Sequence, residues 1–198
     1  NSGTRRNLEV DFFGGEPLMN FQMIKDLVAY ARVREKEANK NFRFTLTTNG
    51  VLVDDDVIDF ANKEMSNVVL SLDGRKEIHD RYRVDFAGNG SWEKIVPKFQ
   101  RFVEKRGNKN YYMRGTFTHA NPDFLKDIED ICRDGVPVSR PLHKIVFAVH
   151  RQRSDNPPFI HRHICGAEMV FLAPCFCRGG YFSANPLFKI HIGYGKII

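Results

Sequence analysis

The 198-residue chain has few cysteines and lacks any long apolar run. Without a run of about 18 apolar residues, a membrane-spanning helix is not expected. A hydrophobic content of 42% with 27% charged residues is typical of a soluble globular protein. The first of the four cysteines is Cys132, so the preceding residues offer no thiolate to a metal centre. The length suits one domain with its own core.

Methionine is absent from the start of the chain, which begins Asn1-Ser2-Gly3. We therefore expect a fragment of a longer protein, and the lack of a signal peptide says little about that parent.

The last third of the chain differs in composition from the rest. Residues 1–132 hold 21 Lys and Arg against 21 Asp and Glu, whereas residues 133–198 hold 9 against 3. This tail shows no helical or strand periodicity sustained over an element. Two hypotheses stay open for it: translation out of frame, or an unrelated natural extension. Its basic residues lack regular aromatic interleaving, so we expect no nucleic-acid partner.

Residues 1–132 alternate strand and helix patterns. Strands are predicted at "LEVDFF", "FRFTLTTNG", "NVVLSLDG" and "YYMRGTFT". Helices are predicted over residues 20–31, 54–63, 91–103 and 121–128, with Ser91 as the cap of the third. A polar loop is expected between the third strand and Ser91. The order βαβαβαβα, with largely apolar strands, predicts an α/β fold in which helices cover a parallel sheet.

Glycines and polar residues stand at the predicted strand ends, where ligands bind in such folds. The four ends read Gly14-Gly15-Glu16-Pro17, Thr48-Asn49-Gly50, Ser71-Leu72-Asp73-Gly74 and Thr116-Phe117-Thr118. Adjacent glycines allow positive φ and remove Cβ atoms, so backbone groups can approach a ligand closely. A tight turn explains "GGEP" equally well, and the second and third ends are also ordinary turn sequences.

Charged residues follow the third strand in "RKEIHDRYR". Arg83 could bind a ligand carboxylate through two hydrogen bonds, although a solvated charge run is the default explanation. His79 has no second His or Cys at metal-ligand spacing, so we expect it to cap or support the structure. The tail cysteines Cys165, Cys175 and Cys177 fit no zinc or iron-sulfur signature, and we predict no metal site there.

Taken together and in order, "VDFFGGEPLMNF", "FTLTTNGVL", "VVLSLDGRKEIHDRYR" and "YYMRGTFT" resemble the radical S-adenosylmethionine (SAM) superfamily. The resemblance covers roughly residues 7–131. Among the peptide-modifying members, the chain is most similar to the maturases that form thioethers in cysteine-rich SCIFF precursor peptides. The anaerobic sulfatase-maturing enzymes share the GGEP, TNG and S-x-DG pattern.

The resemblance implies a partial (β/α)6 barrel without its first βα unit, which binds SAM beside a [4Fe-4S] cluster. Reductive cleavage of SAM then gives a 5′-deoxyadenosyl radical that abstracts hydrogen from a peptide, and in SCIFF maturation a cysteine sulfur becomes bonded to an α-carbon. It also implies a precursor peptide and an electron donor such as ferredoxin or flavodoxin as partners, a cytoplasmic location, and auxiliary [4Fe-4S] clusters in a SPASM-type domain of the parent.

The family's motifs fall on residues expected to bind the cofactor: Gly14, Gly15, Glu16, Pro17, Thr48, Asn49, Ser71, Asp73 and Arg83. The first four would hold the methionine amino end of SAM. Ser71 would bond its ribose or carboxylate region and Arg83 its carboxylate, while the other three would shape the pocket floor.

The resemblance places the cluster ligands in a C-x3-C-x2-C loop after the first barrel strand, ahead of residue 1. This chain lacks those cysteines, so we expect no SAM cleavage by the fragment itself. The alternative from another class is a non-catalytic module that binds a nucleotide or a peptide.

Overall fold

The computed structural model describes residues 2–117 and, beyond them, 126–127, 144–149, 163–164, 167–172, 191–192 and 196–197. In the first range the elements are β1 (Asn7–Phe12), the 3-10 turn η1 (Pro17–Asn20), α1 (Phe21–Ala38), β2 (Asn41–Thr48), α2 (Asp55–Glu64), β3 (Met65–Ser71), α3 (Lys76–Tyr82), α4 (Trp92–Arg106) and β4 (Tyr111–Phe117). The later strands are β5 (Lys144–Val149), β6 (His163–Ile164), β7 (Ala167–Leu172), β8 (His191–Ile192) and β9 (Lys196–Ile197).

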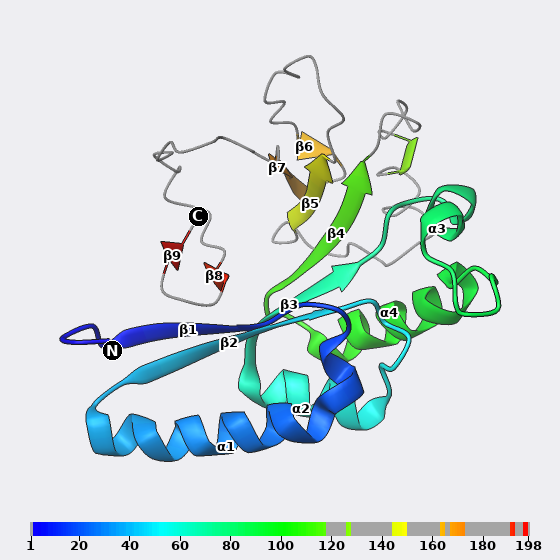
Figure 1. Cartoon of the computed structure of the whole chain (residues 1–198). Coiled ribbons are helices and arrows are strands. Elements are labelled where there is room, and N and C mark those ends of the chain that lie inside the picture. The colour runs from blue at the N-terminus through cyan, green and yellow to red at the C-terminus, as the bar shows by residue number, and fades with distance from the viewer. Residues whose placement is uncertain are drawn as a thin grey trace.

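One sheet of parallel strands organises the molecule (Figure 1). Strands β1 to β5 are neighbours in chain order and pair in parallel, and β7 pairs in parallel with β5. The short β6 is antiparallel to β7. The predicted α/β order and parallel sheet are confirmed, and the arrangement is that of a partial barrel.

Strands β5 and β7 lie in the tail, where the sequence shows no sustained periodicity. The prediction of an irregular tail is therefore wrong for these two segments. Each has six residues. So short an apolar run cannot be assigned to strand or helix by periodicity alone.

Alternation along the strands separates the two faces of the sheet. Phe44 and Leu46 of β2 and Leu70 of β3 are buried in the core beside Ile24 of α1. Figure 1 shows α1 and α2 on the same side of β1 and β2. The residue between Phe44 and Leu46, Thr45, faces away from the helices because successive strand side chains point to opposite faces.

The segment between β3 and α4, predicted as a polar loop, contains helix α3. Only two of its seven residues, Ile78 and His79, are buried, which is too few to produce a helical pattern. Ser91 precedes α4 as predicted, but its side chain makes no capping bond. The N–H of Trp92 instead donates to Oδ1 of Asp80 at 2.9 Å, so α3 caps α4.

The helix predicted over residues 121–128 lies largely outside the described residues. Lys126 and Asp127 are the two of its positions that are described, and both are helical.

Candidate functional site

The predicted site residues gather at the carboxyl ends of β1 to β4. Because these strands are parallel and adjacent, their carboxyl ends form one rim of the sheet. Gly14 and Gly15 connect β1 to η1, Thr48 ends β2, Ser71 ends β3, and Thr116 is near the end of β4. The order of motifs along the chain thus becomes a row of neighbours in space. Their contact with a ligand stays a prediction.

Glu16 fastens the first turn of the rim to the second strand. Its Oε1 accepts hydrogen bonds from the N–H of Leu18 at 3.2 Å and the hydroxyl of Thr48 at 2.9 Å. Its Oε2 accepts from the N–H of Asn49 at 2.7 Å. Pro17 starts η1, where its missing N–H has no helical partner to lose. These contacts indicate that Glu16 and Pro17 shape the turn.

Thr48 and Asn49 also serve the local backbone. The hydroxyl oxygen of Thr48 accepts from the N–H of Gly50 at 3.0 Å, and Oδ1 of Asn49 accepts from the N–H of Val51 at 3.0 Å. Such side-chain bonds two residues along the chain are ordinary turn chemistry. Both residues therefore support the floor of the rim.

The glycines at the rim are required for different reasons. Gly14 and Gly15 have φ of +106° and +27°, and a Cβ at either position would meet no atom within 4 Å. At Gly50 a Cβ would lie 2.4 Å from the ring of Phe99, and at Gly74 it would lie 2.3 Å from an aspartate side chain. Packing demands the latter two, whereas the first two leave open space beside the backbone, as the approach of a ligand requires.

Asp73 orients Arg83. Nε of Arg83 donates to Oδ2 of Asp73 at 2.5 Å and Nη2 donates to Oδ1 at 3.0 Å. The N–H of Thr116 donates to the same Oδ1 at 2.7 Å, and Asp73 is 4% exposed. This buried carboxylate joins β3, β4 and the residue after α3. It commits two of the five N–H groups of Arg83 and leaves the half-buried guanidinium in one orientation.

Arg114 is a candidate site residue that sequence reasoning missed. It lies opposite Ser71 in the β3–β4 register, on the sheet face away from the helices. Its guanidinium carbon lies 5.2 Å from the ring centroid of Phe13. Burial lowers the pKa of Arg114, and the nearby charge of Arg83 acts in the same direction. The signal that could have revealed it is a lone arginine within the strand sequence "YYMRGTFT", at a position that alternation places on the same face as Thr116.

Ser71 and Arg114 together offer unused donors. Ser71 is 8% exposed, and its hydroxyl makes no hydrogen bond to any residue that the structure describes. The guanidinium of Arg114 likewise has no hydrogen-bond acceptor within residues 2–117 or the other described stretches. A partly buried guanidinium beside a hydroxyl suits a carboxylate.

The described residues contain no group of three or more His, Cys, Asp or Glu side chains that could hold a metal ion. The prediction that the tail cysteines hold no metal concerns Cys165, Cys175 and Cys177, which lie outside the described residues. No helix within the described part of the chain is long and apolar enough to cross a membrane.

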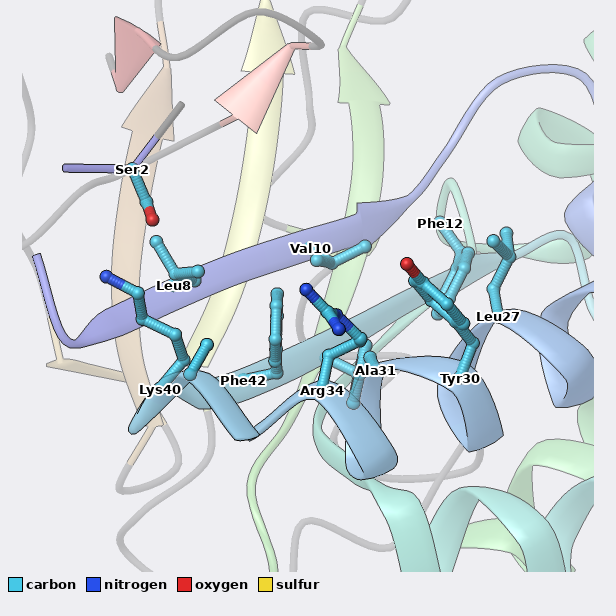
Figure 2. Close-up of a pocket in the computed structure, with 12 residues that line it drawn as sticks. Ser2, Leu8, Val10, Phe12, Leu27, Tyr30, Ala31, Arg34, Lys40 and Phe42 are labelled. Carbon is cyan, nitrogen blue, oxygen red and sulfur yellow. The ribbon is translucent and has the colours of Figure 1, made fainter. Parts of the chain in front are cut away.

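A separate apolar hollow lies between β1 and α1, on the helix side of the sheet (Figure 2). It measures about 340 Å³. Val10 and Phe12 line it from β1, and Leu27, Tyr30 and Arg34 line it from α1. None of the rim residues lines it, so the hollow and the candidate site are distinct.

The radical SAM superfamily model matches residues 5–134. The chain belongs to the radical SAM superfamily. The cysteine-type anaerobic sulfatase-maturating enzyme of Clostridium novyi (strain NT) is 34% identical over 92 residues, which cover 46% of this chain and 24% of that protein. The radical SAM cyclopropyl synthase TigE of Paramaledivibacter caminithermalis is 27% identical over 126 residues, covering 61% and 25%. This radical SAM chain thus spans about a quarter of the length of these relatives.

Solved structures share the fold of this superfamily member. Native anSMEcpe with bound AdoMet and Kp18Cys peptide superposes with a TM-score of 0.61 at 22% identity, over 74% of this chain and 39% of that one. The same protein with bound AdoMet alone gives 0.62.

Proposed function

We propose that residues 1–132 form the SAM-binding middle of a radical SAM peptide maturase. The observation that carries the proposal is the meeting, at one rim, of an open glycine turn, an unbonded hydroxyl at Ser71 and an arginine oriented by Asp73. Backbone carbonyls at Gly14 and Gly15 suit an ammonium group, and Arg83 suits a carboxylate. SAM carries both groups at its methionine end.

The residues present fit SAM but not an iron-sulfur cluster. Clusters of this kind are held by thiolates, and no cysteine precedes Cys132. A [4Fe-4S] cluster would therefore be held by other residues of the parent protein. The task of this chain's own residues is to bind SAM and to fix the direction of its methionine end.

For the whole protein we propose peptide modification by hydrogen abstraction. When bound beside a reduced cluster, SAM supplies the radical that removes the hydrogen atom. The first candidate is thioether formation in a cysteine-rich SCIFF precursor, which rests on the order and spacing of the four motifs. Auxiliary clusters, a ferredoxin or flavodoxin donor and a cytoplasmic location belong to this candidate.

A second candidate is sulfatase maturation. It is favoured by three curated clostridial relatives named as cysteine-type anaerobic sulfatase-maturating enzymes, which are 34%, 33% and 36% identical over their matched segments. A non-catalytic binding module is the third possibility, because residues 1–131 contain no cysteine that could hold a cluster.

SAM binding to the purified chain is the first test. We expect isothermal titration calorimetry to detect binding that Ser71→Ala and Arg83→Ala each weaken about tenfold, since each removes a polar contact to a charged ligand. Ser66→Ala, in the same strand as Ser71, is the matched control and should not change the affinity. A wild-type chain that binds no SAM would refute the proposal.

A longer protein that includes the upstream region tests the chemistry. We expect cluster absorbance and SAM cleavage after anaerobic reconstitution. Binding without either result would identify a non-catalytic module. Mass spectrometry separates the two enzyme candidates, because a thioether crosslink removes two hydrogen atoms from a SCIFF peptide, whereas sulfatase maturation alters a sulfatase-derived peptide.

A further inference from the structure

Behind the rim, Asp73, His79, Ser91 and Arg83 form a closed ring of contacts. The backbone N–H of Asp73 donates to Nδ1 of His79 at 3.3 Å. Nε2 of His79 lies 2.9 Å from Oγ of Ser91, and the Ser91 hydroxyl donates to the carbonyl oxygen of Arg83 at 2.9 Å. The ion pair from Arg83 to the Asp73 carboxylate closes the ring.

The ring fixes the position of every proton in it. Nδ1 of His79 accepts a backbone hydrogen bond, so it carries no proton. Ser91 has one proton and donates it to Arg83, so its oxygen accepts from Nε2–H of His79. His79 is 0% exposed, and burial lowers its pKa to about 4. The imidazole is therefore neutral, with its proton on Nε2.

Both ends of the segment that presents Arg83 are held by this ring. His79 contacts Asp73, where the segment leaves β3, through its side chain, and its carbonyl oxygen accepts from the N–H of Arg83 at 2.9 Å. Ser91 holds Arg83 from the other side, because its N–H also donates to the Arg83 carbonyl oxygen at 3.2 Å. Moving His79 would break one contact of Asp73 and one contact of Ser91 together.

The neighbouring contacts leave α3 little freedom to compensate. Asp80 accepts the N–H of Trp92, and the Trp92 indole N–H donates to the carbonyl oxygen of Gly74 at 3.0 Å. A Cβ at Gly90 would lie 2.1 Å from the Asp80 carboxyl carbon, so the chain packs closely against this helix.

We infer that His79 is a positioning residue for ligand binding, which fixes the direction of the Arg83 guanidinium at the rim through Asp73 and Ser91. The inference rests on the proposed function, in which Arg83 binds the carboxylate of SAM. It gives a specific task to a histidine that the sequence indicates only as capping or structural.

The first test needs no ligand and uses NMR of the full chain. His79→Asn keeps an acceptor near the Nδ1 position but loses the donor to Ser91, and Ser91→Ala removes the middle of the ring. We expect wild-type His79 to show one ring proton, on Nε2, and Arg83 to show a slowly exchanging Nε–H. Both variants should accelerate that exchange about tenfold, which corresponds to about 1.4 kcal/mol, and Ser66→Ala should not. Unchanged Arg83 exchange in both variants would overturn the inference.

The second test measures SAM affinity in the same variants. We expect His79→Asn and Ser91→Ala each to weaken SAM binding. Neither should weaken it further when combined with Arg83→Ala, because the effects of substitutions at contacting residues are not additive. If Arg83→Ala weakens binding but the ring variants do not, the positioning role is wrong and the proposed function stands. If Arg83→Ala and Ser71→Ala also leave binding unchanged, the proposed SAM site is wrong and the positioning role falls with it.

Discussion

Glu16 and Thr48 lie 32 positions apart in sequence and are joined by a 2.9 Å hydrogen bond from the Thr48 hydroxyl to Oε1 of Glu16. The same carboxylate accepts the N–H of Asn49 through its other oxygen. One side chain thus fixes the glycine turn after β1 against the end of β2. The glutamate of "GGEP" is needed for the fold of the rim, whatever the ligand is.

Replacing Glu16 by glutamine should therefore destabilise the chain. Thr48 and Asn49 donate to different oxygens of this carboxylate, and glutamine replaces one of these acceptors by an NH2 donor. We therefore expect Glu16→Gln to lower the free energy of unfolding by about 1–2 kcal/mol. Urea unfolding measures the difference. Glu37→Gln is the control, because this exposed carboxylate pairs with Arg34 at the surface and should matter little. Equal stability of Glu16→Gln and wild type would contradict the role of Glu16.

Gly14→Ala should separate stability from ligand binding. Gly14 and Gly88 have φ of +106° and +82°, and a Cβ at either would meet no atom within 4 Å. Alanine should cost about 1 kcal/mol of stability at each position, because left-handed backbone disfavours a Cβ. Gly14 alone lies on the rim, so SAM affinity, measured by calorimetry, should fall for Gly14→Ala and not for Gly88→Ala. Equal affinities would mean that no ligand approaches this turn.

Much of the fold follows from sequence pattern. The alternation of "FRFTLTT" places Phe44 and Leu46 in the core, and the helical spacing of Ile24 and Val28 predicts the buried face of α1. Side-chain oxygens at helix starts were equally informative, since Asn20 accepts the N–H of Met23. These signals are local, so they can be recognised without knowing the fold.

The ring of Asp73, His79, Ser91 and Arg83 and the pairing of Ser71 with Arg114 could not be predicted, because both depend on tertiary contacts. Serine is a good capping residue by type, yet the Ser91 hydroxyl donates to the carbonyl oxygen of Arg83 and accepts from Nε2–H of His79. The cap of α4 is instead Asp80, which belongs to another helix. Arg114 shares a face with Ser71 only once β3 and β4 pair in register. The spacing of these residues along the chain does not predict that they come into contact.

The reading frame of residues 133–198 is open to a direct measurement. One hypothesis is that the tail is translated out of frame. It predicts that, when the coding DNA is resequenced from upstream of residue 1 through the tail, another frame beyond about residue 131 encodes regular strand and helix periodicity. A natural extension predicts the present frame. Confirmation of the present frame would remove the frame-shift hypothesis and leave β5 and β7 as native strands of the sheet.

Stability should depend on pH through His79. Burial lowers the pKa of His79 from 6.5 to about 4, so between these values the unfolded chain binds more protons than the folded chain. The free energy of unfolding must then fall as the pH drops below 6.5, and we expect His79 to contribute a loss of about 2 kcal/mol between pH 7.5 and pH 5.

Urea unfolding of wild type and His79→Gln at both pH values isolates this contribution. The other histidines are identical in the two proteins, so the difference between the two slopes belongs to residue 79. Identical slopes would mean that the pKa of His79 is the same in the folded and the unfolded chain, contrary to its burial and to its hydrogen bonds with Asp73 and Ser91.

Arg114 should lower the stability of the folded chain and strengthen the binding of SAM. Its guanidinium is partly buried, and its pKa is lowered mainly by this burial, although the charges of Asp11 and Asp73 act in the opposite direction. No described residue accepts a hydrogen bond from it, so burying this charge is expensive. Arg114→Met keeps the apolar length and should leave the free energy of unfolding unchanged or raise it by about 1 kcal/mol. SAM affinity should fall about tenfold, because a carboxylate would lose a charged donor beside Ser71.

Arg43→Met is the matched control for Arg114. Arg43 is an exposed arginine in β2, paired with Glu9 near the opposite end of the strands, so its replacement should leave SAM affinity unchanged. Loss of stability in Arg114→Met without loss of affinity would make Arg114 a structural residue, held by Phe13 for packing alone. A loss of affinity at constant stability would instead place a ligand carboxylate between β3 and β4.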